Sequence, residues 1–199
     1  MAVADSQTKI YRCINNHSFD VAREGYLNLH LAQHKRSKSP GDSEPMIKSR
    51  QRFLNGGYYQ PLADAISNTI NNCPLSFEQK LLDIGCGEGY YLQQLRNIAE
   101  RSNANLELLG LDVSKAGVRL AAKRKLNALL VVDSAYKIPL FDHSVDTVLS
   151  VFSPISPEET ARVLKTDGYL IMVGPGEEHL TGLTAHIYDQ HQPHAGNFK

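Results

Sequence analysis

The sequence predicts an α/β protein built on a doubly wound, mostly parallel β-sheet. Five short runs rich in leucine, valine and isoleucine have the length and composition of buried strands, at residues 80–84, 107–111, 128–132, 147–152 and 169–173. Stretches with a helical pattern lie between them, at residues 91–102, 114–125 and 157–164. This alternation of strands and helices is typical of parallel βαβ units.

The part of the chain before the first strand differs in composition. Residues 1–31 contain an aromatic segment and read as a small N-terminal module, and residues 32–52 are polar and basic and read as a linker. Helical patterns cover residues 46–54 and 61–71, with Pro61 suited to a first helical turn. We therefore expect a small module over residues 1–31, a basic linker over 32–52 and the α/β domain over 53–199.

The first strand run leads into the sequence Leu-Leu-Asp-Ile-Gly-Cys-Gly-Glu-Gly-Tyr. Its apolar run ends in Asp83, and glycines alternate at Gly85, Gly87 and Gly89, which predicts a tight turn that lets a ligand approach bare backbone. Tyr90 stands where a dinucleotide-binding fingerprint has its last glycine. The loop therefore favours a nucleotide-like ligand other than NAD, and S-adenosylmethionine fits it better.

Acidic residues end the next two strand runs. Asp112 follows the second strand and can accept hydrogen bonds from ribose hydroxyls, and Asp133 and Ser134 follow the third, where a side chain can contact an adenine amine. Each signal has a structural alternative: a glycine-rich turn can be a simple strand-to-helix connection, and Asp112 can be the N-cap of the helix that begins near Ser114. Their order at successive strand ends favours a nucleoside site.

Several segments resemble known methyltransferases. Residues 133–146 and 162–171 resemble segments of class I S-adenosylmethionine-dependent methyltransferases, whose fold is Rossmann-like. Other segments resemble the RlmA family of bacterial 23S ribosomal RNA (guanine-N1) methyltransferases. These segments are residues 16–29, 33–37, 40–43, 52–54, 59–62, 83–91, 110–115, 175–176 and 179–180.

The resemblance implies methyl transfer from S-adenosylmethionine to N1 of a guanine in a 23S RNA hairpin. The three cysteines are few and scattered, which favours a reduced cytoplasm over a disulfide framework. Positions that contact the cofactor in the family correspond to Tyr59, Gly89, Tyr90 and His179. The basic residues of the linker would lie near the RNA, namely Lys35, Arg36, Lys38, Arg50 and Arg52. A homodimer is a possible assembly, and no apolar run approaches the length of a membrane span.

Two departures from the family follow from the chain ends. The family carries an N-terminal zinc module with a Cys-x-x-Cys pair followed by a Cys and a His. Cys13 and His17 match only the second half, since residues 1–12 contain no cysteine. Structural zinc needs four ligands, so zinc binding is doubtful. The chain also stops before the family's last helix and two strands, and we expect a sheet of five strands, truncated at both ends.

The sequence leaves the catalytic residues unknown. Guanine N1 must lose a proton, and Asp133, Asp142 and His179 are all candidate bases. Residues 150–155 follow the fourth strand beside the expected methyl acceptor and lack the Asn-Pro-Pro-Tyr pattern of enzymes that methylate exocyclic amines. Two alternative functions stay open: a methyltransferase of small molecules, and an inactive fragment that binds S-adenosylmethionine or RNA.

Overall fold

The structure is a computed structural model that describes residues 3–5, 10–12, 16–30, 41–73 and 78–187. The predictions that concern Cys13, Lys35, Arg36 and Lys38 lie outside these residues.

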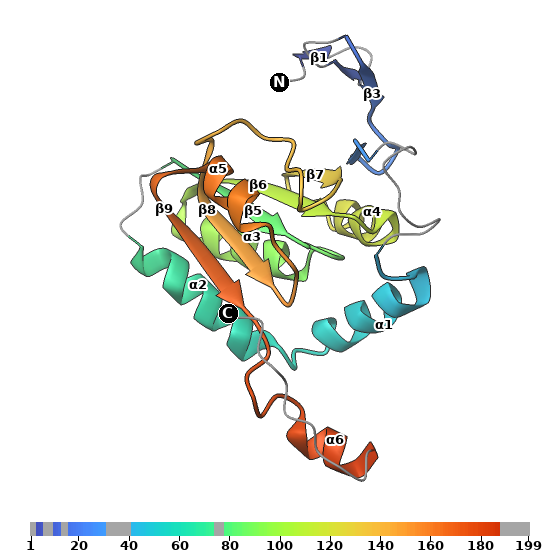
Figure 1. Cartoon of the computed structure of the whole chain (residues 1–199), viewed down its shortest axis with the longest axis vertical. Coiled ribbons are helices and arrows are strands. Elements are labelled where there is room, and N and C mark those ends of the chain that lie inside the picture. The colour runs from blue at the N-terminus through green and yellow to red at the C-terminus, as the bar shows by residue number, and fades with distance from the viewer. Residues whose placement is uncertain (1–2, 6–9, 13–15, 31–40, 74–77, 188–199) are drawn as a thin grey trace.

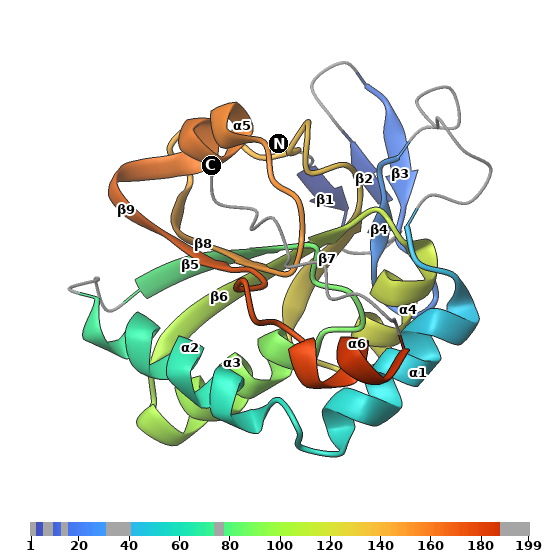
Figure 2. The ribbon, with the colours of Figure 1, turned by 60° about the horizontal axis from the view of Figure 1, so that its bottom comes forward.

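The main sheet runs through the centre of the molecule (Figures 1 and 2). In the described part of the chain it has six strands in the order β4-β7-β6-β5-β8-β9, and every neighbouring pair is parallel. The expected number of five is therefore wrong, because a two-residue strand from the N-terminal region pairs with β7. The strands are β4 (Leu27–Asn28), β5 (Glu78–Ile84), β6 (Asn105–Asp112), β7 (Ala128–Val132), β8 (Val145–Val151) and β9 (Leu164–Val173).

Helices cover the two faces of the sheet unequally (Figure 2). Helices α2 (Gln60–Asn72), α3 (Tyr90–Ser102) and α4 (Lys115–Lys123) cover one face, and α1 (Glu44–Asn55) packs beside α3 and α4. The short α5 (Pro157–Val163) lies on the other face, and α6 (Thr181–Ile187) follows β9. The hydroxyls of Ser114 and Ser156 cap α4 and α5 by accepting backbone N–H bonds, as serine does at helix starts.

The N-terminal residues fill the face that the helices leave open. Strands β1 (Val3–Asp5), β2 (Ile10–Arg12) and β3 (Ser18–Asp20) form a small antiparallel sheet. Tyr11, Phe19 and Val21 pack against the apolar core on the α5 side of the main sheet. Alternate residues of each main strand face the two cores, so Leu81 belongs to one and Leu82 to the other.

The predicted strands and helices agree with the structure except at their ends. The last strand begins at Leu164 rather than at residue 169. A register shift between Val145 and Thr147 lets β8 bridge Leu164 as well as Tyr169, so residues 165–168 fall inside a bulged strand. Among the described residues, no helix is long and apolar enough to cross a membrane.

The N-terminal region is continuous with the main domain. Leu27 and Asn28 extend its sheet, and Ile47 and Leu54 of α1 are buried. The limits at residues 31 and 52 stay a prediction, but residues 44–52 of the expected linker lie in a packed helix.

Ile47 tests whether α1 is an integral part of the domain. Its side chain is 1% exposed, whereas the neighbouring Met46 is 56% exposed. We expect Ile47→Ala to cost about 2–5 kcal/mol of stability, because it leaves a cavity. That loss corresponds to a fall of roughly 5–15 °C in Tm, measured by circular dichroism. Met46→Ala is the matched control and should leave Tm nearly unchanged; equal effects of the two variants would show that α1 is only loosely attached.

Candidate functional site

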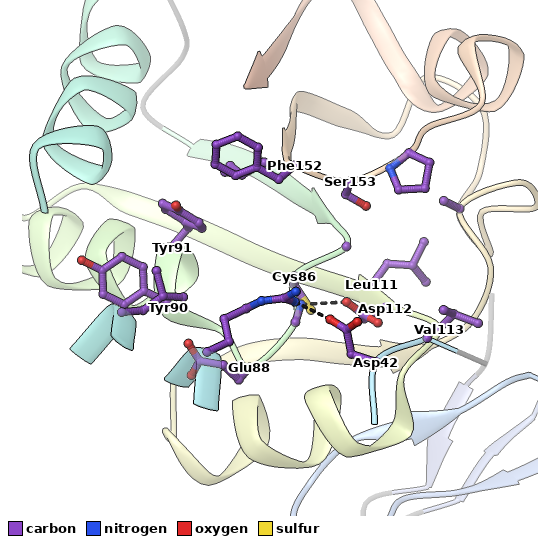
Figure 3. A pocket seen from close by; sticks show the side chains of 18 of the residues that line it. Asp42, Cys86, Glu88, Tyr90, Tyr91, Leu111, Asp112, Val113, Phe152 and Ser153 are labelled. Atoms are coloured by element: carbon purple, nitrogen blue, oxygen red, sulfur yellow. Dashed lines mark hydrogen bonds and ion pairs between the residues drawn. The ribbon is translucent and has the colours of Figure 1, made fainter. Parts of the chain in front are cut away.

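A cleft opens at the carboxyl ends of the central strands. The chain proceeds outward from β5 to β6 and β7 on one side and returns to β8 and β9 on the other. Ligands bind at such a reversal of strand order in open α/β sheets. The cleft has a volume of about 720 Å³, and Figure 3 shows the side chains that surround it. This volume lies in the range of small-molecule sites.

The glycines after β5 form the floor of the cleft. Gly85 has a φ of +76°, and a Cβ there would overlap the Ser153 hydroxyl. Gly87 has a φ of +54°, and a Cβ there would meet no atom within 4 Å. Gly89 has a φ of +84° and begins α3, where a Cβ would lie 3.0 Å from that of Ala121. Gly87 therefore exposes its backbone to a ligand, while Gly85 and Gly89 permit close packing behind it.

Asp112 holds this loop in place. One carboxylate oxygen accepts a hydrogen bond from Gly87 N at 2.8 Å, and the other accepts from Ser114 N at 2.7 Å. Burial raises the pKa of Asp112, and these two hydrogen bonds oppose that rise. Ser114 is the N-cap of α4, so the alternative in which Asp112 caps this helix is wrong. Each carboxylate oxygen has a second lone pair, which leaves acceptor capacity for a ribose hydroxyl.

Asp83 lies beneath the loop and does not line the cleft. Its carboxyl is 2% exposed, and one of its oxygens has no hydrogen-bond partner among the described atoms. Burial, and secondarily the charge of Asp112, raises its pKa from 3.8 to about 8. Burial also raises the pKa of the neighbouring Cys86 thiol, so this side chain behaves as a small apolar residue rather than as a nucleophile.

Glu88 anchors the loop from the opposite side, and sequence reasoning missed it. Its carboxylate is 1% exposed and accepts a hydrogen bond from Arg124 Nε at 2.8 Å. Arg124 Nη2 also contacts the Glu88 carboxylate and donates to Asn55 Oδ1 at 2.9 Å, and Gln51 donates to the same carboxylate at 3.2 Å. The pair therefore joins the loop to α1 and α4. The sequence did offer one signal: Glu88 is the only acidic residue in a loop that otherwise consists of glycine and cysteine.

Asp133 and Ser134 directly follow β7, at the adenine side of the expected nucleoside site. Asp133 accepts a hydrogen bond from Ser134 N at 2.8 Å, and Asp133 N donates to Asp112 O at 3.2 Å. His30 Nδ1 lies 3.5 Å from the Asp133 carboxylate, and His30 N donates to Val132 O at 3.0 Å. A residue of the N-terminal region thus supports this side of the cleft.

The N-terminal region also supplies one wall, which sequence reasoning missed. Gly41 has a φ of +78° and packs against Ser114, whose hydroxyl donates to Asp42 O at 3.0 Å. Arg50 lines the cleft and pairs with Asp42 at 2.6 Å. Arg50 is therefore turned toward the cleft rather than standing free for RNA, while Arg52 donates to Ser49 on the exposed side of α1. Only the Pro-Gly-Asp turn signal of residues 40–42 pointed to this wall.

The structure brings together eight of the ten predicted cofactor-binding residues around the cleft; Asp83 and Gly89 support it from behind. Their contacts with a cofactor stay a prediction. Asp142 lies outside the cleft lining and pairs with Arg162 at 2.8 Å, so it is unsuited to act as a base there. The eight residues are Tyr59, Gly85, Gly87, Tyr90, Asp112, Asp133, Ser134 and His179.

The residues that the structure describes do not by themselves form a zinc site. No group of three or more His, Cys, Asp or Glu side chains that could hold a metal ion occurs in the part of the chain that the structure describes. His17 is exposed, and its predicted partner Cys13 lies outside that part. The other cysteines, Cys73 and Cys86, lie at the end of α2 and in the glycine loop.

The raised pKa of Asp83 predicts a pH-dependent stability. Its folded-state pKa lies above its unfolded value, so its contribution to stability is complete below about pH 3.8 and is lost as the pH rises through about 8. Asp83→Asn is neutral at every pH. We expect the Tm of Asp83→Asn relative to the parent chain to increase between about pH 6 and about pH 9. The same Tm difference at both pH values would show that the carboxyl titrates normally.

Arg124 tests the anchor of the loop. Arg124→Met leaves the Glu88 carboxylate buried without its cation, which costs about 3–5 kcal/mol for pairs of this kind. Urea unfolding should show this loss, and the double variant Glu88→Gln, Arg124→Met should lose less than Arg124→Met alone. Lys123→Met, at the exposed neighbouring position, is the control. If the double variant is less stable than the single one, the carboxylate does not depend on this arginine.

Comparison with known families agrees with the geometry. Residues 3–38 match the zinc-ribbon family described as "RlmA, N-terminal", and residues 81–168 match a methyltransferase domain family. A crystal structure of a SAM-dependent methyltransferase from Aquifex aeolicus superposes with a TM-score of 0.56 at 22% identity, covering 77% of this chain and 79% of that protein. This likeness shows the fold alone.

Curated relatives are similar over most of the chain. The 23S rRNA (guanine(748)-N(1))-methyltransferase of Streptomyces fradiae is 34% identical over 180 residues, which cover 89% of this chain and 62% of that protein. A Bacillus subtilis protein with a provisional 23S rRNA (guanine-N(1)-)-methyltransferase name is 34% identical over 174 residues, covering 86% and 60%. The chain spans about 60% of the length of these relatives. The predicted resemblance is therefore confirmed: the chain joins an RlmA-type N-terminal zinc-ribbon sequence to a domain with the class I methyltransferase fold.

Proposed function

We propose that the chain transfers a methyl group from S-adenosylmethionine to N1 of a guanine in 23S ribosomal RNA. The observation that carries the proposal is the cleft at the carboxyl ends of β5, β6 and β7, where an open glycine loop faces two strand-terminal carboxylates. Similarity to the Streptomyces fradiae enzyme over 89% of the chain supports the choice of substrate.

The cleft suits the shape and polarity of the cofactor. Asp112 offers acceptors for the ribose, and Asp133 and Ser134 lie at the same strand-end level for the adenine. The open side of Gly87 leaves room for a chain of atoms to run along the loop toward Tyr59 and His179. When bound, S-adenosylmethionine supplies an electrophilic methyl group on a positively charged sulfur.

The residues of the chain contribute mainly by holding the reacting atoms in line, which alone can supply a large part of the rate enhancement. The guanine must leave its stack to reach the cleft, and its N1 proton must leave as the new N–C bond forms. Of the three candidate bases, Asp133 and His179 line the cleft, but Asp133 lies at the side proposed for the adenine. We therefore place the proton acceptor at His179 or at a water that it orients.

RNA contacts belong to the N-terminal region in this proposal. Residues 1–60 carry nine Lys and Arg against five Asp and Glu, a balance that favours phosphate binding. Arg52 and the basic residues of the linker are the proposed phosphate contacts, and Arg50 belongs to the cleft. The 23S hairpin as target, action in the cytoplasm and a homodimer stay predictions. Of the four zinc ligands that the family pattern has, the sequence matches two, Cys13 and His17.

Methyl transfer to RNA tests the proposal directly. The chain is incubated with radiolabelled S-adenosylmethionine and unmodified 23S RNA, and reverse-transcription stops are mapped, because a methyl on N1 blocks Watson–Crick pairing. We expect label in RNA and a stop at one guanine. Transfer to small nucleosides alone would indicate a small-molecule enzyme, and cofactor binding without any transfer would indicate an inactive fragment.

Asp112→Ala tests whether the cleft binds S-adenosylmethionine. Removing a carboxylate that bonds the loop and the ribose should raise the Kd for S-adenosylmethionine about 10- to 100-fold, measured by calorimetry. Glu100→Ala removes an exposed carboxylate on α3 and should leave this Kd unchanged. An unchanged Kd in Asp112→Ala would place the cofactor elsewhere.

A further inference from the structure

One end of the cleft carries a chain of aromatic ring contacts, which we call the aromatic rim: Phe53, Tyr58, Tyr59, Phe152 and His179. Phe53 stacks on Tyr58 with ring centroids 4.9 Å apart and meets Tyr59 edge-on at 5.7 Å. Phe152 meets Tyr59 at 6.2 Å and His179 at 5.6 Å. The rim joins residues from α1, the turn after it, the end of β8 and the segment after β9.

Three of these rings are exposed rather than buried in the core. Phe53 is 49% exposed, Tyr58 71% and Phe152 43%. Large apolar side chains that gather at a cleft, unlike those scattered singly over a surface, mark binding sites. The rim therefore presents aromatic faces to a partner.

The backbone is shaped to hold two of these rings in place. Phe152 has a φ of +52°, a strained conformation for a bulky residue, and its N–H donates to Val173 O at 2.8 Å. A Cβ at Gly56 would lie 2.9 Å from the Tyr58 ring, so the glycine lets this ring fold back over Phe53. Strain of this kind is stored at functional sites more often than elsewhere.

The aromatic rim lies across the glycine loop from the nucleoside end of the cleft. Phe53, Phe152 and His179 line the same cleft as Asp112. In Figure 3, Cys86 of the loop lies between Asp112 on one side and Phe152 on the other. A cofactor bound through Asp112 and the loop would therefore present its far end toward Phe152.

We infer that the aromatic rim is the binding site of the target base, a purine turned out of its RNA hairpin, and that this base stacks on the ring of Phe152. This inference rests on the proposed function and adds the residues that receive the substrate. An unstacked base loses its neighbours, and an aromatic side chain replaces them with one π-face against another. Arg52, next to Phe53 on the exposed side of α1, would contact a phosphate, while the rim holds the base.

Two measurements on the whole chain test this inference. The first compares methyl transfer to 23S RNA by the parent chain, Phe152→Ala, Phe152→Tyr and Phe141→Ala. Phe141 is an exposed phenylalanine, 61% exposed, that does not line the cleft. We expect Phe152→Ala to raise the KM for RNA about 10-fold or more. Phe152→Tyr, which keeps an aromatic ring, and the control Phe141→Ala should both have the KM of the parent chain. Calorimetry should give all four the same Kd for S-adenosylmethionine, within about twofold.

The second measurement is independent of catalysis. The ribonucleoside of 2-aminopurine, whose fluorescence is quenched by stacking, is titrated into each variant with S-adenosylhomocysteine present. We expect saturable quenching with the parent chain and Phe152→Tyr, and its loss in Phe152→Ala. If the parent chain quenches the probe but methylates no RNA, the proposed function fails, while the inference that the aromatic rim binds a purine is kept. Equal KM values, or equal quenching by Phe152→Ala and the parent chain, would overturn the inference.

Discussion

The arrangement of the cleft depends on the buried ion pair between Glu88 and Arg124. The glycine loop has few side chains of its own with which to fix its position, and Glu88 is the one long side chain within it. Through Arg124 and Gln51 this carboxylate joins the loop to α4 and α1. Replacing water around two charges is costly, so a buried pair of this kind adds little net stability, and we infer that its role here is to specify one geometry. Here the specified geometry is that of the backbone facing the ligand.

The second constraint comes from the N-terminal region, which takes part in the α/β domain rather than only preceding it. Residues 27–30 extend the sheet and support Asp133, and residues 41–50 form a wall of the cleft. The polar and the apolar contacts of this region have different roles. Tyr11 and Phe19 attach it to the face that α5 leaves open, while His30, Asp42 and Arg50 shape the site.

The sequence predicted the strands and helices of the α/β domain closely because buried parallel strands are nearly pure apolar runs, and the glycine spacing marks the first loop. It missed β4 because two residues carry no periodic signal. It missed the wall at Asp42 because the hydrogen bond that fixes this wall joins Asp42 to Ser114, 72 positions further along the chain. Asp112 and Asp133 were placed from strand ends alone. Residues 150–155 were placed beside the expected methyl acceptor. The burial of Glu88 and the strained backbone of Phe152 were not foreseen, because they depend on the packed structure rather than on local pattern.

The pairing of β4 with β7 has a consequence for the evolution of such proteins. A module that reads RNA is often treated as a cassette that can be exchanged between enzymes. In this chain the strand that follows the small N-terminal sheet, β4, hydrogen-bonds to β7, which leads directly to Asp133 at the cleft. Exchange of the N-terminal module would therefore also rebuild part of the α/β domain. Under the proposed function, a change of RNA target would then alter the cofactor cleft as well.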